Sequence, residues 1–160
     1  MLTIITNPHP VLRQRATEVT EITAPATQKL IDDMIPAMLA ADGIGLAAPQ
    51  INQSVRIIIV NTKDGPQAYI NPVIHAFSFT KEIMEEGCLS LPGIFGMVYR
   101  ATEIDVSVTL RDGTNKRFSA KGLHARVIQH EVDHLNGILF IDRAEASSLT
   151  KSSHETTPAL

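Results

Sequence analysis

The chain has 160 residues, of which 44% are hydrophobic and 19% are charged, as expected for one globular domain with its own core. Its formal net charge of −3 argues against a protein specialised for nucleic acid, because phosphate binding requires clustered Lys and Arg, and its apolar runs are too short to span a membrane. Cys88 is the only cysteine and the N-terminal residues lack the pattern of a signal peptide, so we expect no intramolecular disulfide and a cytoplasmic location.

The first predicted elements are a helix, a loop and a buried strand. Across residues 25–41, apolar side chains recur at spacings of three and four residues, which is typical of an amphipathic helix. Pro36 lies inside this stretch, so we expect a kink or a break there. The glycines of residues 43–50 predict a loop, and residues 55–60, which are rich in β-branched side chains, predict a buried strand.

The second half of the chain is predicted to contain further strands and a second helix. Residues 69–85 have extended character, and residues 104–108 and 116–120 are expected to form the two arms of a hairpin around a turn at 112–113. Residues 123–136 have helical periodicity, which a glycine then ends.

Several strands and two principal helices, without regular strand–helix alternation, indicate an α+β fold. We expect a single domain with mixed or antiparallel β-sheets packed around a C-terminal helix, and with an N-terminal helix. We expect residues 1–143 to form this domain. Residues 144–160 are rich in Ser and Thr, which predicts a polar, flexible tail.

The strongest local signal is the HExxH sequence His130-Glu131-Val132-Asp133-His134 inside the second predicted helix. Side chains four residues apart on a helix face the same way, so both imidazoles can bind one metal ion. Glu131 can then reach a water molecule at that ion without being a ligand itself. The alternative is that the two histidines only line a helix surface or cap a core, since such strings also occur by chance.

A catalytic metal site of this kind usually has three protein ligands and keeps a fourth position for water. Cys88 is the candidate for the third ligand, although a lone thiol is more often a small buried hydrophobe. The neighbouring Gly87, two preceding glutamates and a following Pro-Gly pair indicate a turn or strand end rather than a core strand.

The glycine-containing loop at residues 43–50 is a third candidate element. Its missing side chains leave room for a substrate backbone, and Gln50 could donate its amide N–H to a developing oxyanion. Two glycines separated by one residue also occur in loops that have no such role.

Together these segments resemble the three motifs of the peptide deformylase family. They read GIGLAAPQ at 43–50, EGCLS at 86–90 and QHEVDHLNG at 129–137, in the order of the family. Further similarity lies in NPHPVLRQRA, YINP and GLHARVIQHEVDHLNGILFIDR, so the resemblance covers about residues 5–143.

The resemblance implies roles for individual residues. Cys88, His130 and His134 would bind the metal, Glu131 would be the general acid and base, and Gln50 with the backbone N–H of Leu89 would form the oxyanion hole. Gly45 would bind the substrate backbone through its carbonyl. The methionine pocket would be lined by Ile44, Met84, Leu123, Arg126 and Val127, with the charge of Arg126 at its rim.

Supporting residues are implied as well. Glu86 and Arg100 occupy positions that pair in relatives, and they would form a buried ion pair that braces the turn at Cys88. The alternative is two unrelated surface charges. Asp133 belongs either to the shell around the ligands or to the solvated side of the helix.

The implied activity is hydrolysis of the N-formyl group from the N-terminal formylmethionine of newly made proteins, with release of formate. The implied cofactor is one divalent ion, with Fe²⁺ ranked first because many relatives work best with it, and Zn²⁺, Ni²⁺ or Co²⁺ as alternatives. Expected partners are formyl-methionyl nascent peptides and, transiently, the ribosome, without direct nucleic-acid binding and without a membrane.

Two other readings remain. An ordinary HExxH endopeptidase would normally take a third ligand from a downstream His or Glu, and the only later histidine is His154. A structural metal module would need four protein ligands, and the chain has no second cysteine.

Overall fold

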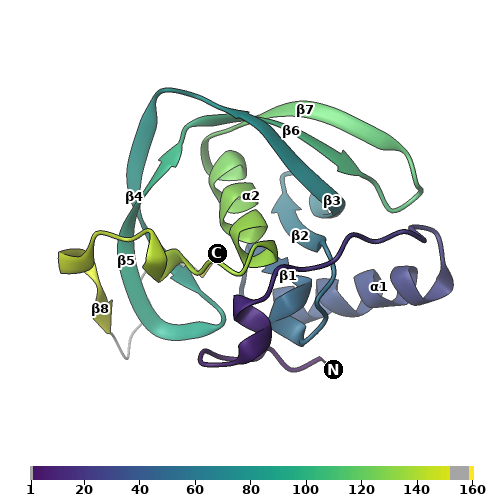
Figure 1. Cartoon of the computed structure of the whole chain (residues 1–160), viewed down its shortest axis with the longest axis horizontal. Helices are drawn as coiled ribbons and strands as arrows, with labels where there is room; N and C mark the ends of the chain where they lie inside the picture. Colours follow the sequence, from purple (N-terminus) through teal and green to yellow (C-terminus); the bar gives the residue numbers. More distant parts are fainter. Residues whose placement is uncertain (1, 152–158) are drawn as a thin grey trace.

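The structure is a computed structural model that describes residues 2–151 and 159–160 (Figure 1). Its α-helices are α1 (Pro25–Ala40) and α2 (Gly122–Leu135), and its short 3₁₀ helices are η1 (Pro10–Arg13), η2 (Ala48–Ile51), η3 (Phe140–Asp142) and η4 (Ala146–Ser148). Its strands are β1 (Gly45–Ala47), β2 (Ile57–Thr62), β3 (Gly65–Phe77), β4 (Lys81–Cys88), β5 (Leu91–Ala101), β6 (Glu103–Thr109), β7 (Asn115–Lys121) and β8 (Thr150–Lys151).

The strands form two antiparallel sheets. The larger sheet has the order β1-β2-β3-β6-β7, and the smaller one has the order β4-β5-β8. The predicted hairpin is present as β6 and β7, whose register runs from Glu103 opposite Lys121 to Thr109 opposite Asn115. The α+β prediction is therefore confirmed, with antiparallel pairing throughout the two sheets.

Helix α2 lies at the centre of the molecule. Figure 1 shows it between the hairpin of β4 and β5 and the larger sheet. Every residue from 125 to 135 is buried, so the helix is enclosed on all sides after its exposed first turn. It ends before Gly137, whose φ of 74° is the left-handed conformation that glycine adopts after a helix.

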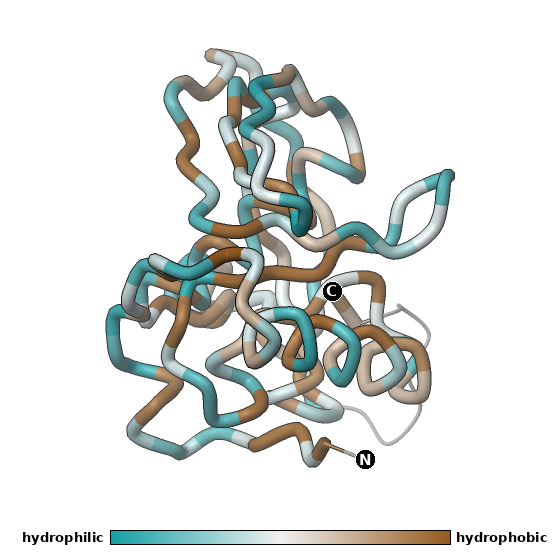
Figure 2. Tube along the Cα trace, turned by 90° about the vertical axis from the view of Figure 1, so that its right-hand side faces the viewer, coloured by the Kyte–Doolittle hydropathy of each residue, from teal (hydrophilic) through white to brown (hydrophobic). Residues whose placement is uncertain are grey.

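Strand β2 separates two parts of the hydrophobic core. Ile58 and Val60 pack in the same cluster as Val127 and Ile128 of α2. Their neighbours Ile57 and Ile59 point to the other face, because successive side chains of a strand alternate, and they pack in the cluster of α1 residues Ile31, Met34 and Met38. Burial of each such aliphatic side chain contributes about 1.5–3 kcal/mol. In Figure 2 hydrophobic stretches cross the middle of the molecule, and the turn that projects on the right is hydrophilic.

Two local expectations need correction. We expected a kink or a break at Pro36, and the break is absent, because helix α1 continues to Ala40. Pro36 is exposed, so the carbonyl that loses its donor lies on the solvent side of the helix. The expected loop at residues 43–50 is also more ordered, because β1 pairs with β2 and η2 follows directly.

The predicted tail, residues 144–160, is described in part. Residues Ala146–Ser148 form η4, and β8 pairs with Ile94 and Phe95 of β5. Leu160 is buried and donates its backbone N–H to the carbonyl of Gly87 at 3.1 Å. Residues 152–158 lie outside the described residues, so flexibility of the tail stays a prediction.

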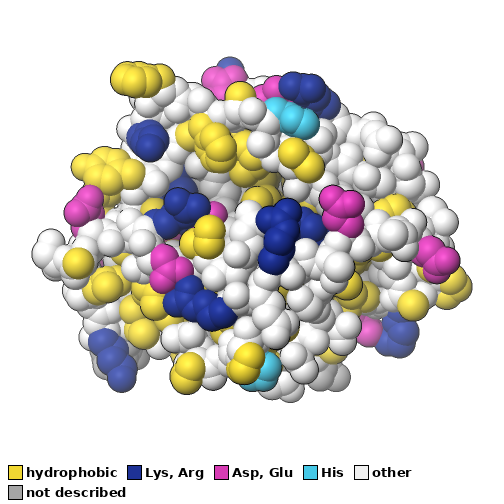
Figure 3. Space-filling view, in the orientation of Figure 1, with side chains coloured by type: hydrophobic (Ala, Val, Ile, Leu, Met, Phe, Trp, Pro, Cys, Tyr) yellow, Lys and Arg dark blue, Asp and Glu magenta, His cyan; other side chains and the backbone are white. Residues whose placement is uncertain are grey.

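Two further features concern the surface. Within the described ranges 2–151 and 159–160, no helix is long and apolar enough to cross a membrane. Figure 3 shows a hollow near the centre of one face, with dark-blue Lys and Arg side chains beside it and hydrophobic side chains above it.

Candidate active site

The two histidines of the HExxH sequence lie one helical turn apart on α2. Their ring centroids are 5.1 Å apart, and both side chains are buried. The two side chains therefore lie close together, as their spacing of four residues on a helix predicted.

Cys88 lies at the end of β4, where the pairing with β5 shifts register after Gly87. Its Sγ is 3.3 Å from Nε2 of His134. Cys88, His130 and His134 each offer one ligand atom, and these atoms lie within 4.8 Å of one another. Metal bonds of ~2.3 Å to sulfur and ~2.0–2.1 Å to nitrogen in a tetrahedral site imply a separation of about 3.5 Å between two such ligands. The observed spacing fits this geometry.

The unsatisfied polar atoms of the buried interior also gather here. Nε2 of His130, Nδ1 of His134 and both carboxylate oxygens of Glu131 are buried and have no hydrogen-bond partner among the described residues. Buried polar groups are normally paired, because an unpaired one costs free energy. One thiol and two imidazoles with free nitrogen atoms are suitable ligands for a divalent transition metal.

The pKa shifts of Cys88, His134 and Glu131 agree with a metal site at this place. Burial, and then the charge of Glu131, raises the pKa of the Cys88 thiol, while burial lowers the pKa of His134 well below its usual value. Burial, followed by the negative charge of Glu86, raises the pKa of Glu131 well above its usual value. A divalent cation would favour both the thiolate and the carboxylate, and would use neutral imidazoles as ligands.

Gln50 is held against the turn that carries Cys88. It is fully buried, and its Oε1 accepts a hydrogen bond from the backbone N–H of Ala47 at 2.9 Å. Its Nε2 lies 3.2 Å from Oγ of Ser90 and 3.6 Å from Sγ of Cys88. The donor end of the amide is thereby turned towards the metal ligands. Ser90 was not singled out from the sequence, although it lies within the EGCLS motif.

Gly45 brings β1 into close contact with α2. A Cβ atom at this position would lie 2.8 Å from Cγ1 of Val127 and would also collide with the carboxylate of Glu131. Only glycine therefore fits between this strand and the side chain of Glu131. The sequence predicted space for a substrate backbone here, but it did not reveal this packing requirement.

Glu86 anchors the site from behind. Its carboxylate is fully buried and accepts hydrogen bonds from Nε and Nη2 of Arg100, both at 3.0 Å. It also lies 2.9 Å from Nδ1 of His130, which fixes the imidazole ring and leaves Nε2 free. Burial alone would raise the pKa of Glu86, but the hydrogen bonds from His130 and Arg100 and their charges lower it below the usual range. The predicted pairing of Glu86 with Arg100 is thus present.

Asp133 belongs to the same network. Its carboxylate accepts from Nη1 of Arg100 at 2.6 Å and from Nε and Nη2 of Arg143 at 2.6 and 2.9 Å. The residue is 7% exposed, so it is not a solvated helix residue. Arg100 therefore joins the two buried carboxylates.

The predicted placement of the Arg126 charge is wrong. Its guanidinium does not lie at a pocket rim but is buried, donating to Glu86 at 2.6 Å and to the carbonyls of Val98 and Glu82 at 3.0 and 2.6 Å. The physical reason is that Glu86 offers a buried countercharge on the side of α2 that faces β4 and β5. Nothing in the sequence around Arg126 indicated this partner.

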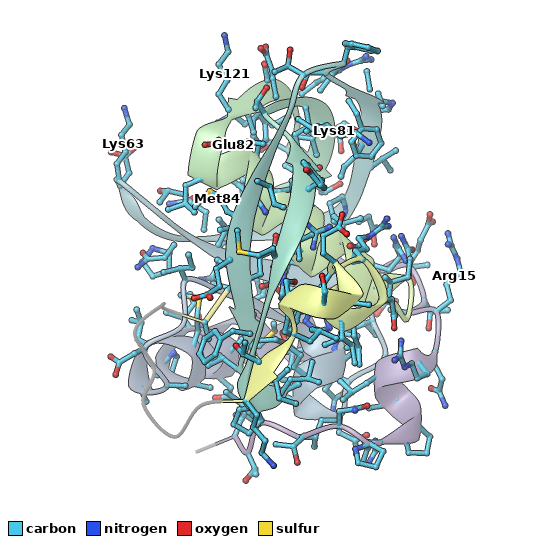
Figure 4. The ribbon with its side chains drawn as sticks, turned by 90° about the vertical axis from the view of Figure 1, so that its left-hand side faces the viewer. Arg15, Lys63, Lys81, Glu82, Met84 and Lys121 are labelled. Atoms are coloured by element: carbon cyan, nitrogen blue, oxygen red, sulfur yellow. The ribbon has the colours of Figure 1, made fainter. Side chains whose placement is uncertain are left out.

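Of the other predicted pocket residues, three line one cavity. Ile44, Leu123 and Val127 surround a volume of about 630 Å³, together with Tyr69 and His124. Met84 is not among the residues that line it and is 38% exposed on β4, on the hairpin nearest the viewer in Figure 4. His154, the downstream histidine that an endopeptidase site would require, lies outside the described residues.

Comparison with known proteins identifies the family. The profile of the polypeptide deformylase family matches residues 1–150. A peptide deformylase from Halothermothrix orenii is 52% identical over 136 residues, which are 84% of this chain and 87% of that protein. The chain belongs to the peptide deformylase family.

Solved deformylase structures have the same fold. That of Thermotoga maritima has a TM-score of 0.88 and 43% identity, and the match covers 91% of this chain and 98% of that one. A Met-Ala-Ser-bound deformylase of Acinetobacter baumannii has a TM-score of 0.86 and 36% identity over 89% of this chain and 98% of that one. This deformylase is accordingly a metal-dependent hydrolase that acts on a formylated amide.

Proposed function

We propose that Cys88, His130 and His134 hold one divalent ion, and that Glu131 acts as general acid and base in removing the formyl group from N-terminal formylmethionine. The observation that carries the proposal is the grouping of the three ligand atoms within 4.8 Å, beside the unpaired, buried carboxylate of Glu131. When bound, the ion would polarise the formyl carbonyl and lower the pKa of water.

Glu131 performs the proton transfers. Both of its oxygens lack a hydrogen-bond partner among the described residues, so either can accept the proton of an attacking water molecule. Water adds to the formyl carbon, and Glu131 then delivers the proton to the departing amine nitrogen. The C–N bond breaks, and the products are formate and a peptide with a free N-terminal methionine. Gly45 leaves the space in which this carboxylate lies.

Gln50 and the backbone N–H of Leu89 stabilise the oxyanion of the tetrahedral intermediate. The contacts of Gln50 with Ala47 and Ser90 fix its amide before the substrate arrives, and such preorganised donors are worth about 3 kcal/mol each. Gly45 would bind the substrate backbone through its carbonyl.

The methionine side chain would enter the cavity lined by Ile44, Leu123 and Val127, whose apolar surfaces suit a thioether. Met84 would contact the substrate from the exposed side of β4. Arg126 contributes at most its methylene groups to this pocket, because its guanidinium forms an ion pair with Glu86. The Met-Ala-Ser peptide bound to the Acinetobacter relative is of the kind that this reaction leaves as product.

We rank Fe²⁺ first as the native ion, with Zn²⁺, Ni²⁺ and Co²⁺ as alternatives. The ranking rests on the family alone, since a thiolate and two imidazoles bind several divalent ions and simple affinity favours Zn²⁺ over Fe²⁺. Protein purified anaerobically is analysed for metal and compared with protein rebuilt with each ion. A strongly active, air-stable zinc form would overturn the iron preference.

The proposed setting is the cytoplasm, transiently near the ribosome, where formyl-methionyl chains emerge. The deciding experiment for the function is formate release from a formyl-methionyl peptide, with the acetyl peptide of the same sequence as the matched control. The extra methyl group should crowd the space between the metal ligands and Gln50, so the formyl peptide should be hydrolysed far faster. Equal rates, or efficient cleavage of an internal peptide bond, would contradict the proposal.

A further inference from the structure

A second cavity, of about 580 Å³, has no lining residue in common with the proposed methionine pocket. Arg15 lines this second cavity and Lys63 lines the methionine pocket, and Figure 4 shows them on opposite sides of the molecule. On the face seen in Figure 3, basic side chains flank a hollow. The basic residues that line the second cavity are Arg15, Arg56, Lys81, Arg100 and Arg143, and the acidic ones are Glu18 and Asp133.

Two of these arginines differ from the other arginines of the chain. Arg15 and Arg56 have no carboxylate oxygen within 4.0 Å among the described residues, and both line this cavity. Each of the remaining arginines forms an ion pair within that distance; they are Arg13, Arg100, Arg111, Arg117, Arg126 and Arg143. The unpaired guanidinium groups of the described chain are therefore concentrated at one place.

Arg56 is the more informative of the two because it is 7% exposed. The one hydrogen bond that its side chain makes to the described residues is from Nη1 to the carbonyl of Leu135, at 2.9 Å. Burial, and then the charge of Arg15, lowers the pKa of Arg56, while Glu18 acts in the opposite direction. A buried charge is costly unless an opposite charge compensates it, and among residues 2–151 and 159–160 no carboxylate lies within 4.0 Å of this guanidinium.

Arg15 adds a second, more accessible cation. Its Nη1 donates to Oδ1 of Asn136 at 3.2 Å, and its other side-chain N–H groups have no hydrogen-bond partner among the described residues. The same cavity is bordered by exposed aromatic rings, since Phe77 is 60% and Tyr99 is 54% exposed. Cationic groups and aromatic rings thus border one hollow.

We propose that this cavity binds a small phosphate ester, with its phosphate between Arg15 and Arg56 and its organic part against Phe77 and Tyr99. A phosphate monoester carries close to two negative charges at neutral pH and can neutralise both guanidinium groups, whereas a monocarboxylate would leave one uncompensated. The planar guanidinium also matches the geometry of phosphate oxygens. The cavity volume is sufficient for a molecule the size of a mononucleotide.

The probe is adenosine monophosphate, titrated calorimetrically into the metal-loaded enzyme. We expect binding at one site per chain and no binding of adenosine, which lacks the phosphate. Arg15→Gln should weaken binding about tenfold or more, because it removes a charge-assisted contact. Glu18→Gln should strengthen it by removing a competing charge. The matched control is Arg111→Gln, which removes one positive charge outside the cavity and should change the affinity less than twofold.

Arg56→Met supplies an independent test on the buried charge. The folded variant, checked by its circular dichroism and melting temperature, should lose adenosine monophosphate binding. If Arg56→Met fails to fold, the exposed Arg15 variant still decides the matter. Absence of binding to the wild-type enzyme, or equal weakening by Arg111→Gln, would overturn the proposal.

A ten-nucleotide RNA is the comparison ligand, because RNA offers the same phosphate chemistry from another source. Binding of this RNA without binding of adenosine monophosphate would overturn the assignment to a small molecule. The titration requires no deformylation, so a negative result would leave the proposed catalytic function unaffected.

Discussion

Helix α2 has polar groups on two sides, and the two sides differ in how these groups are paired. On one side, His130, His134 and Glu131 are buried with nitrogen and oxygen atoms that have no hydrogen-bond partner in the described chain. On the other, Asp133 and the neighbouring Glu86 are also buried, yet their carboxylates bind several arginine N–H groups. Burial alone therefore does not mark the reactive groups, whereas burial without a partner does.

The paired side supports the unpaired one. Glu86 reaches across by binding Nδ1 of His130, so the ring that offers Nε2 to a metal is oriented by the ion-pair network. Variants of the unpaired groups should therefore mainly reduce the catalytic rate, and variants of the paired groups should mainly reduce the free energy of unfolding.

The largest effect is expected from the ligands. Cys88→Ser and His134→Ala each leave two of three ligands, so activity should fall below detection together with metal content, while the circular dichroism spectrum should stay close to that of wild type. Metal is measured by mass spectrometry on protein purified without chelators. A variant that keeps both a full complement of metal and normal turnover would remove that residue from the ligand set.

Glu131→Gln should have the next largest effect, and of a different kind. The amide preserves the shape of the side chain but cannot transfer the proton, so the rate should fall about 10²–10⁴-fold. Metal content should remain at the wild-type level because Glu131 is not a ligand. Near-normal formate release by this variant would exclude Glu131 as the acid–base group.

Arg100→Met should mainly lower the stability of the folded protein. The side chain is 4% exposed and binds both Glu86 and Asp133, so its loss leaves two buried carboxylates with fewer partners and should lower the free energy of unfolding by about 3–5 kcal/mol. Urea denaturation measures the change. Arg111→Met is the matched control, because its partner Asp32 is 62% exposed and an ion pair at the surface contributes less than about 1 kcal/mol. Equal losses in the two variants would contradict a special role for the buried network.

Sequence patterns were sufficient where the relevant contacts are local. The spacing of His130 and His134 gave their convergence because a helix fixes it, and the hairpin of β6 and β7 followed from alternation around a turn. Local context made Cys88 a candidate ligand, but only the family resemblance assigned it, since no local rule states that a strand end 42 residues before His130 will meet it.

Long-range partners could not be predicted in this way. The charge of Arg126 would be expected at the surface on burial statistics, and only the folded structure brings Glu86 to it. Similarly, the collision that any side chain at Gly45 would make with Glu131 depends on how β1 packs on α2. Pro36 is accommodated because it lies on the exposed side of α1. The sequence pattern did not indicate that the helix would continue there rather than break.

The enclosure of α2 has a consequence for how the protein can vary. Eleven successive residues, 125–135, are buried, whereas in α1 the buried positions are Ile31, Met34, Ala37 and Met38. In a library containing every single substitution, tolerance along α1 should oscillate with a period of about 3.6 residues. Along residues 125–135 of α2 it should be uniformly low, because none of these positions faces solvent, whereas Leu123 in the first turn is 54% exposed. The helix that contains His130, Glu131 and His134 should therefore also be the one that tolerates the fewest substitutions.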